Sequence, residues 1–342
     1  MKKLIDKLEK SQVLTRDEIK ELLAYDGDYL FERARYTARS IYGNKIFARG
    51  LIEVTNYCKC DCYYCGLRRS NSSAVRYRLT KSQVMDCCKM GYNLGFRTFV
   101  LQGGEDGYYT DEILVELISG IKSQFPDCAV TLSIGERSYE SYKQLFDAGA
   151  DRYLLRHETA NDAHYSKLHP PEMLLSNRKK CLLDLKEIGY QVGCGFMVGT
   201  PGQTLDNIVD DLLFIKELDP AMVGVGPFVP HSATPFAENR PGDLRLTLNI
   251  LAMLRLMKPN LLIPATTALG SIDSKGRELA VLAGANVIMP NLSPVDARKK
   301  YLLYNNKIST DGETADNFSN IKRSMKDIGY DIISARGDYF DL

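Results

Sequence analysis

Residues 191–225 read QVGCGFMVGTPGQTLDNIVDDLLFIKELDPAMVGV and contain the clearest fold signal in the chain. This stretch contains an apolar strand pattern at Gln191–Val198, a turn rich in glycine and proline, an amphipathic helix pattern, and a second apolar strand pattern at Met222–Val225. Thr204 stands where its side chain can cap the first turn of the helix. A strand, a helix and a further strand in this order predict a βαβ unit with parallel strands.

The same alternation runs through the chain from residue 49 onward, and several helix boundaries are readable in it. Thr80 and Gln83 have the spacing of a capping box before an apolar-periodic segment. Gly149 and Gly189 stand where helices are expected to end, just before a strand. The strands predicted in this way are Gly50–Asn56, Thr98–Gln102, Ala129–Ile134, Arg152–Arg156, Gln191–Val198, Met222–Val225, Leu261–Thr266 and Asn286–Pro290.

Eight strands alternating with helices predict an α/β protein with a complete (β/α)8 TIM-type barrel over residues 49–304. No Pro/Ser-rich linker interrupts the alternation, which favours one barrel over two domains. The alternative fold is an open doubly wound sheet. Residues 1–48 predict an N-terminal helical extension, with a second capping box at Thr15 and Glu18. The polar residues 305–342 are expected to form a C-terminal extension packed on the barrel.

The composition is that of an ordinary globular protein. The 342 residues include 44 Lys and Arg against 43 Asp and Glu, with 44% hydrophobic and 25% charged residues. These proportions exclude disorder and collagen-like repetition, and the balanced charge gives no support for nucleic acid or a membrane as a partner. The first ten residues lack the apolar region of a signal peptide, and no run of about 18 uncharged apolar residues occurs. We therefore expect a cytoplasmic protein.

Three cysteines follow the first predicted barrel strand in the pattern Cys58-x-x-x-Cys62-x-x-Cys65. In a reducing compartment nine cysteines are not expected to form a disulfide framework. Thiolates bind zinc and iron–sulfur clusters, but a closed zinc site needs four ligands and this spacing supplies three. Three thiolates on a four-iron cluster leave one iron open to a further ligand. Cys60 is predicted to be a bystander between these ligands.

The other cysteines fall within predicted helices or strands, where cysteine is usually a small buried side chain. They are Cys87, Cys88, Cys128, Cys181 and Cys194.

The cysteine pattern resembles that of the radical S-adenosylmethionine (SAM) superfamily. This resemblance implies a [4Fe-4S] cluster held by Cys58, Cys62 and Cys65, whose open iron binds the amino and carboxylate groups of SAM. It also implies reductive cleavage of SAM to methionine and a 5′-deoxyadenosyl radical. Longer strings, over about residues 50–308, resemble the HydE family of [FeFe]-hydrogenase maturases, which is similar to biotin synthase and methylornithine synthase. These strings are CGLRR (65–69), LQGGED (101–106), DRYLLRHETAN (151–161), MVGTPGQT (197–204), GPFVPH (226–231), IPATTA (263–268) and ANVIMPN (285–291).

The HydE resemblance also implies a substrate and partners. The substrate would be a small anionic one, a cysteine-bound iron carbonyl–cyanide complex on the way to the [FeFe]-hydrogenase H-cluster. Other hydrogenase maturases would be partners, in an anaerobic setting. Two alternatives stay open: a methylornithine synthase-like rearrangement of an amino acid, and a non-enzymatic iron–sulfur protein. The latter is disfavoured because electron-transfer clusters usually have four thiolate ligands.

One departure from the HydE pattern concerns a second cluster. HydE proteins often carry three further cysteines near the C-terminus, where this chain has Ser309, Asp316 and Ser319 or their neighbours. No cysteine follows Cys194, so we expect one [4Fe-4S] cluster.

The remaining site candidates follow the carboxyl ends of predicted strands, where barrel active sites are built. Arg156 is predicted to hold an anionic substrate group, Glu158 to accept hydrogen bonds from ribose hydroxyls, and His157 between them to be a scaffold residue. The predicted cofactor-binding residues are Gly103, Gly104, Glu105, Ser133, Glu158, Arg178 and Gly199. The predicted catalytic residues are Arg156, Thr266, Thr267, Met289 and Tyr301, the last two because the resemblance places them near the substrate cavity.

Overall fold

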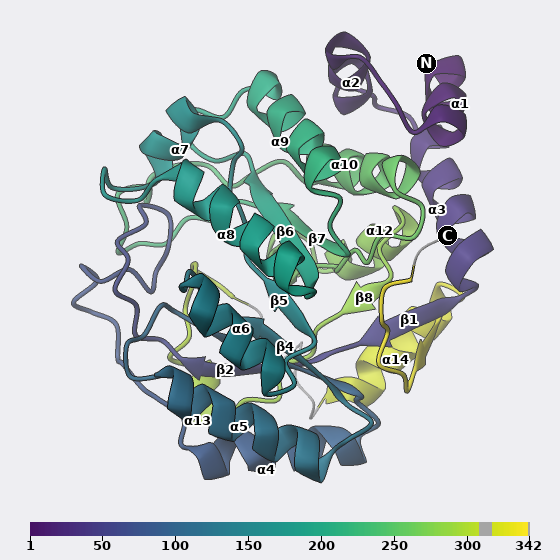
Figure 1. The fold of residues 1–342 in the computed structure, drawn as a ribbon. Coiled ribbons are helices and arrows are strands. Elements are labelled where there is room, and N and C mark those ends of the chain that lie inside the picture. Colours follow the sequence, from purple (N-terminus) through teal and green to yellow (C-terminus); the bar gives the residue numbers. More distant parts are fainter. Residues whose placement is uncertain (308–316, 341–342) are drawn as a thin grey trace.

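The computed structural model describes residues 1–307 and 317–340, and a six-stranded parallel sheet lies at its centre (Figure 1). The strands lie in chain order, so each pairs with the next one along the sequence. Repeated βα units produce this order, and the α/β prediction is confirmed. The strands are β2 (Gly50–Thr55), β3 (Thr98–Gly103), β4 (Ala129–Ser133), β5 (Arg152–Leu154), β6 (Gln191–Val198) and β7 (Met222–Pro227).

Helices cover the outside of this sheet (Figure 1). The capping boxes predicted at Thr80 and Thr15 are present, and Thr204 caps its helix as expected. Gly189 ends a helix in the left-handed conformation, with φ 108°, directly before β6. The helices that follow the strands are α4 (Lys81–Asn93), α5 (Asp111–Gln124), α6 (Tyr139–Asp147), α7 (Asp162–Leu168), α8 (Leu175–Ile188), α9 (Leu205–Leu218), α10 (Leu244–Met257), α11 (Thr267–Ile272), α12 (Gly276–Leu282) and α13 (Val295–Arg298).

The last two predicted barrel strands differ from expectation. Residues 261–266 make isolated parallel bridges, Leu262 with Met222 and Pro264 with Val287, instead of a regular strand. Pro264 has no N–H to donate to a neighbouring strand. The N–H of Ile263 is also unavailable for strand pairing, because it donates to the Asn286 side chain. The final strand, β8 (Val287–Ile288), is shorter than predicted. The described residues therefore form a six-stranded sheet where eight strands were expected.

A second, three-stranded sheet has the order β8-β1-β9, and its β1–β9 pairing joins segments from the N-terminal and C-terminal parts of the chain. β1 (Lys45–Ala48) lies within residues 1–48, which were predicted to be helical. That prediction is wrong for these four residues. β9 (Asp331–Ile333) lies near the C-terminus and pairs with β1 in parallel. Neither short strand has a local pattern that predicts it, because each depends on a partner far away in sequence. The terminal helices are α1 (Lys2–Ser11), α2 (Arg16–Leu23), α3 (Tyr29–Tyr42) and α14 (Phe318–Asp327).

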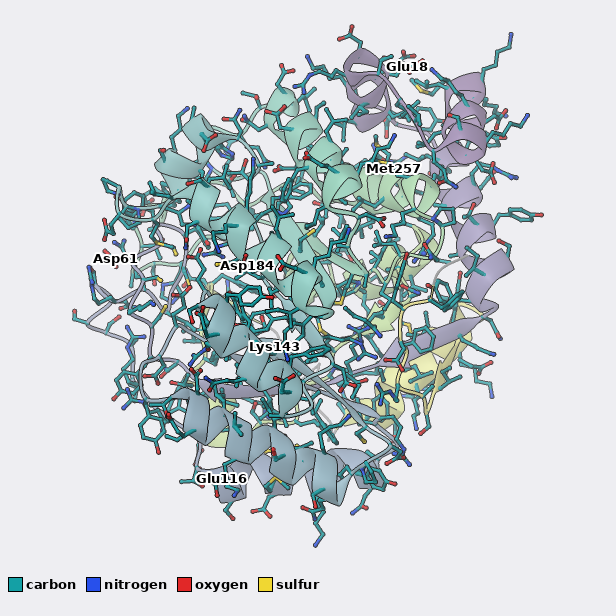
Figure 2. The ribbon with its side chains drawn as sticks, viewed as in Figure 1. Glu18, Asp61, Glu116, Lys143, Asp184 and Met257 are labelled. Atoms are coloured by element: carbon teal, nitrogen blue, oxygen red, sulfur yellow. The ribbon has the colours of Figure 1, made fainter. Side chains whose placement is uncertain are left out.

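Charged side chains such as Glu18, Glu116, Lys143 and Asp184 stand around the outside of the molecule (Figure 2). The predicted buried cysteines, Cys87, Cys88, Cys128, Cys181 and Cys194, are indeed buried. Within residues 1–307 and 317–340, no helix combines the length and the apolarity that are needed to cross a membrane.

One buried ion pair ties the end of the barrel sequence to the first strand of the main sheet. The Lys307 ammonium contacts Glu53 of β2, and their side chains are 4% and 0% exposed. We expect Lys307→Met to lower the free energy of unfolding by about 3–5 kcal/mol, because it leaves the Glu53 carboxylate buried without compensation. Urea unfolding monitored by circular dichroism measures this loss.

Lys81→Met is the matched control, since Lys81 pairs with Glu116 at the surface. Lys81→Met should lower the free energy of unfolding by less than about 1 kcal/mol. A Lys307→Met variant as stable as this control would contradict the structural role of the buried pair.

Candidate active site

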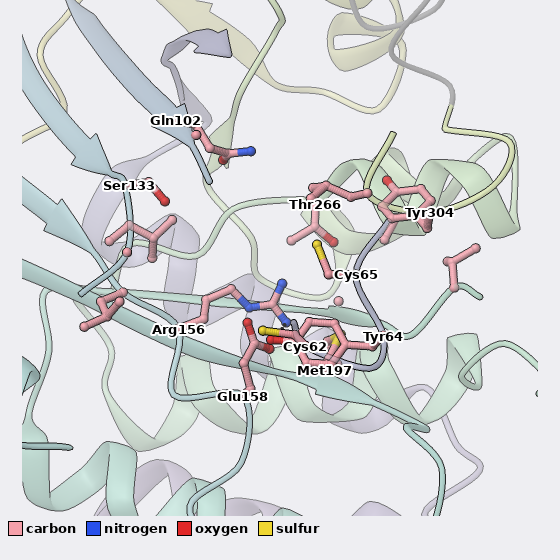
Figure 3. Close-up of a pocket in the computed structure, with 18 of the residues that line it drawn as sticks. Cys62, Tyr64, Cys65, Gln102, Ser133, Arg156, Glu158, Met197, Thr266 and Tyr304 are labelled. Carbon is pink, nitrogen blue, oxygen red and sulfur yellow. Dashed lines mark ion pairs between the residues drawn. The ribbon is translucent and has the colours of Figure 1, made fainter. Parts of the chain in front are cut away.

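A cavity of about 280 Å³ lies at the carboxyl ends of the central strands (Figure 3). It brings together many of the predicted site residues from loops far apart in sequence. Those that line it are Cys62, Cys65, Gly103, Ser133, Arg156, Glu158, Arg178, Thr266 and Tyr301. Those that do not line it are Cys58, Gly104, Glu105, Gly199, Thr267 and Met289.

The three predicted metal ligands lie on the loop that follows β2. Cys62 and Cys65 face the cavity, while the Sγ of Cys58 accepts a hydrogen bond from the N–H of Glu105 at 3.3 Å. The Sγ of Cys65 accepts another, from the N–H of Leu67 at 3.4 Å. Backbone N–H groups of this kind stabilise the charge on cluster thiolates, so the donor set fits an iron–sulfur cluster.

The loop does not resemble a site for a single metal ion. Among the residues that the structure describes, no three Cys, His, Asp or Glu side chains converge as the ligands of one ion would. A cubane cluster has a different requirement, because each thiolate binds a separate iron and the sulfurs surround the cluster. The three thiols are therefore not placed as the ligands of one zinc ion would be.

The three thiols differ in acidity. A hydrogen bond with the Cys60 side chain lowers the pKa of Cys58 to about 7, whereas burial raises the pKa of Cys65 to about 12. Burial also raises the pKa of Cys62 well above its ordinary value. Bound iron compensates the charge of thiolates, so we expect loading of this site to release protons.

The turn after β3 supports the cysteine loop. A Cβ atom on Gly104 would lie 2.2 Å from the carbonyl oxygen of Tyr57 and 2.6 Å from the Cβ of Cys58, so this close approach requires glycine. The N–H of Lys59 donates to the carbonyl of Glu105 at 2.9 Å. Gly104 and Glu105 thus contact the cysteine loop from outside the cavity, and their predicted contact with SAM stays a prediction.

Two arginines and a glutamate form the charged wall of the cavity. Arg156 and Glu158, just beyond β5, make an ion pair of 3.1 Å and extend toward Cys62 (Figure 3). Arg178 on α8 is buried, donates to the carbonyl of Arg156 at 2.9 Å, and forms an ion pair with Glu136. These guanidinium groups are suited to bind carboxylate or other anionic groups of a ligand.

Of the other predicted catalytic residues, two line the cavity and two do not. Thr266 and Tyr301 line the cavity, and the Tyr301 hydroxyl accepts a hydrogen bond from Gln102 at 3.3 Å. Thr267 begins α11 next to the cavity. Met289 packs against the apolar cluster that contains Met222, so its predicted substrate contact has no support from the cavity lining.

Gly199 also lies outside the cavity lining, in the turn after β6 with φ 81°. A Cβ atom there would lie 2.4 Å from the Cα of Gly242, so the glycine serves a close backbone approach.

Several lining residues were missing from the sequence analysis. Some had a readable signal: Tyr64 lies inside the cysteine motif, and Gln102 is the last residue of a predicted strand. The apolar ones have no chemical signal of their own, because a leucine or methionine at a strand end is usually core. Most of them lie within the strings that resemble the HydE family. The missed lining residues include Tyr64, Gln102, Leu154, Leu155, Met197, Pro227, Val229, Ala268, Leu303 and Tyr304.

Comparison with known proteins agrees with this site. Residues 52–215, which hold the three cysteines and the wall formed by Arg156, Glu158 and Arg178, match the model of the radical SAM superfamily. The chain is 46% identical over 311 residues to the [FeFe] hydrogenase maturase subunit HydE of Thermotoga maritima, covering 90% of this chain and 88% of that protein. It is a radical SAM enzyme. Within that superfamily it belongs to the HydE family, whose cofactors are a [4Fe-4S] cluster and SAM.

Two further relatives agree with the fold. The 3-methylornithine synthase of Methanosarcina acetivorans is 30% identical over 291 residues, covering 83% of this chain and 81% of that protein. The crystal structure of methylornithine synthase (PylB) superposes with a TM-score of 0.84 at 27% identity, covering 96% of this chain and 97% of that one.

Replacing cysteines one at a time tests the ligand assignment. We expect Cys62→Ala to lose the cluster after anaerobic reconstitution with iron and sulfide, because two thiolates cannot replace three. Cys60→Ala is the matched control in the same loop and should keep it. Absorbance near the iron–sulfur charge-transfer bands and EPR after reduction report the cluster. A normal cluster in Cys62→Ala, or its loss in Cys60→Ala, would show that the ligands are assigned wrongly.

Proposed function

We propose that this chain cleaves SAM reductively and directs the 5′-deoxyadenosyl radical at a small anionic substrate, a cysteine-bound iron carbonyl–cyanide complex, during H-cluster assembly. The 46% identity to HydE supports this proposal. The single structural observation that carries it is the arrangement of the cavity, which two cysteines and three charged side chains line together. A cluster held by Cys58, Cys62 and Cys65 would supply the electron that cleaves SAM.

The residues around the cavity divide into a SAM side and a substrate side in this proposal. Arg178 is placed to bind the SAM carboxylate, and Glu158 to accept hydrogen bonds from the ribose hydroxyls. Arg156 lies beside them, and its Nε is buried with no hydrogen-bond partner among the described residues. A buried donor without a partner is costly, so an anionic substrate group is a suitable partner for Arg156. Thr266 and Tyr301 would supply hydroxyl groups to the same ligand.

We also propose a single [4Fe-4S] cluster in each chain, because no cysteine follows Cys194. Of the positions where related proteins often have cysteines, Ser309 and Asp316 lie outside the described residues. Ser319 lies in α14. As further partners we propose the other proteins that assemble the hydrogenase site.

The domain organisation is part of the proposal. A closed eight-stranded ring is supported by the isolated bridges that continue the sheet on both sides, Met222 with Leu262, Pro264 with Val287, and Leu51 with Asn291. Closure would enclose the substrate and exclude water from the radical. Residues 49–304 would then be the catalytic barrel, with 1–48 and 305–342 as extensions around it.

The test of the proposed function is complementation. A strain that makes [FeFe] hydrogenase but lacks its own HydE should recover hydrogen evolution when this chain is expressed, and should not recover it with Cys62→Ala. The methylornithine synthase relatives favour a second candidate, the rearrangement of an amino acid. Production of 3-methylornithine from an amino acid by the reconstituted protein, together with failed complementation, would favour that candidate.

Substitutions in the charged wall test the division of roles. Charge-assisted hydrogen bonds contribute about 1.5–3 kcal/mol each, or roughly 10- to 150-fold in affinity. Arg156→Gln should weaken substrate binding by a factor in that range and leave SAM cleavage without substrate largely intact. Arg178→Gln should instead weaken SAM binding first. SAM affinity and the yield of 5′-deoxyadenosine, with and without substrate, measure both effects.

Loss of SAM binding in Arg156→Gln would contradict this division. Arg156 would then belong to the SAM side of the cavity.

A further inference from the structure

His157 is a buried titratable residue that the proposed chemistry does not use. It lies between Arg156 and Glu158, whose side chains line the cavity (Figure 3), and its own side chain is fully buried outside the cavity lining. The imidazole packs near the ring of Phe196 on β6 and the ring of Phe214 on α9, at centroid distances of 5.8 and 5.0 Å. The ring is therefore wedged between the sheet and a helix.

Both ring nitrogens of His157 have polar neighbours. The N–H of Gly195 on β6 donates to Nδ1 at 3.3 Å, so the proton of the neutral ring lies on Nε2. Nε2 is 3.4 Å from the Oδ1 of Asp211 on α9, which also accepts the N–H of Ala160. Burial lowers the pKa of His157 to about 3, so the ring is neutral at physiological pH.

These contacts surround a strained residue. Glu158 has φ 65°, a left-handed conformation that side chains other than glycine rarely adopt. Its N–H donates to the carbonyl of Gly195 at 3.0 Å, and it forms an isolated parallel bridge with Phe196. The chain is thus held on both sides of Glu158. His157 accepts a hydrogen bond from Gly195 and lies 3.4 Å from Asp211, and Ala160, two residues after Glu158, donates its N–H to Asp211.

We propose that His157 and Asp211 are positioning residues that hold Glu158 in its left-handed conformation, so that its carboxylate and Arg156 both face the cavity. The side chain of His157 is buried outside the cavity lining, whereas Arg156 and Glu158 on either side of it line the cavity. Without the buried pair, residue 158 would relax toward an ordinary backbone conformation and its carboxylate would leave the cavity. This proposal rests on the proposed function in one respect, that Glu158 binds the ribose of SAM.

The experiment measures the SAM affinity of the reconstituted holoenzyme by anaerobic isothermal titration calorimetry. His157→Phe keeps the ring packing but removes both polar contacts, and it should weaken SAM binding at least about tenfold, the loss expected for one charge-assisted hydrogen bond. His157→Gln can still accept from Gly195 and donate to Asp211. It should stay within about threefold of the unmodified enzyme.

A control separates positioning from general loss of stability. Asn249 on α10 is also buried and donates to the carbonyls of Leu23 and Tyr25, away from the cavity. Asn249→Ala should lower the melting temperature and leave SAM affinity unchanged. If His157→Phe fails to fold, Asp211→Leu takes its place, because it removes the carboxyl oxygen that faces both His157 and Ala160 and should likewise weaken SAM binding.

Two results would overturn the proposal. Unchanged SAM affinity in His157→Phe, with a clear loss in Glu158→Gln, would show that the backbone at Glu158 needs no such support. Unchanged affinity in both variants would show that Glu158 does not bind SAM. This result would contradict the role of Glu158 in the proposed function and, with it, the positioning role of His157 and Asp211.

Discussion

The close approach of Gly104 to the backbone of Tyr57 is the contact on which the site depends. It brings the turn after β3 against the loop after β2, and the N–H of Glu105 then reaches the Sγ of Cys58. The other end of the loop is fixed as well, because the N–H of Gly66 donates to the carbonyl of Leu303 at 2.8 Å. A thiolate loop held at both ends faces the cavity in a defined position, as a preorganised metal site requires.

The charged wall of the cavity follows from the parallel sheet. Parallel strands end at one edge, so the loop after β2, the ends of β3 and β4 and the turn after β5 all meet there. Arg156 and Arg178 are held close together although their like charges repel, and Glu158 and Glu136 compensate them. Such a wall offers two guanidinium groups to an anionic ligand.

Much of this organisation could be predicted from the sequence, because it is encoded locally. The strand and helix periodicities placed β2 to β7, and the capping residues Thr80 and Thr204 marked the starts of their helices. The cysteine spacing and its position after a strand indicated both the chemistry and the face of the sheet. Cys62, Cys65, Arg156 and Glu158, all of them singled out in the sequence, line one cavity.

The parts that could not be predicted depend on contacts between distant segments. β1 and β9 form because residues near both ends of the chain pair with each other, and Pro264 prevents a regular strand that its apolar neighbours favour. The apolar lining of the cavity, such as Met197, looks like ordinary core in the sequence. Glu158 is the clearest case, since its left-handed backbone depends on tertiary contacts that no local pattern shows.

Reductive cleavage of SAM by this chain is tested by identifying the products that form from SAM under strictly reducing, anaerobic conditions. Reconstituted protein is incubated with dithionite and SAM, and the products are separated by liquid chromatography with mass spectrometry. We expect 5′-deoxyadenosine and methionine to form in equal amounts, and only when reductant is present. A protein with a full complement of iron and sulfide that binds SAM but forms no 5′-deoxyadenosine would contradict it.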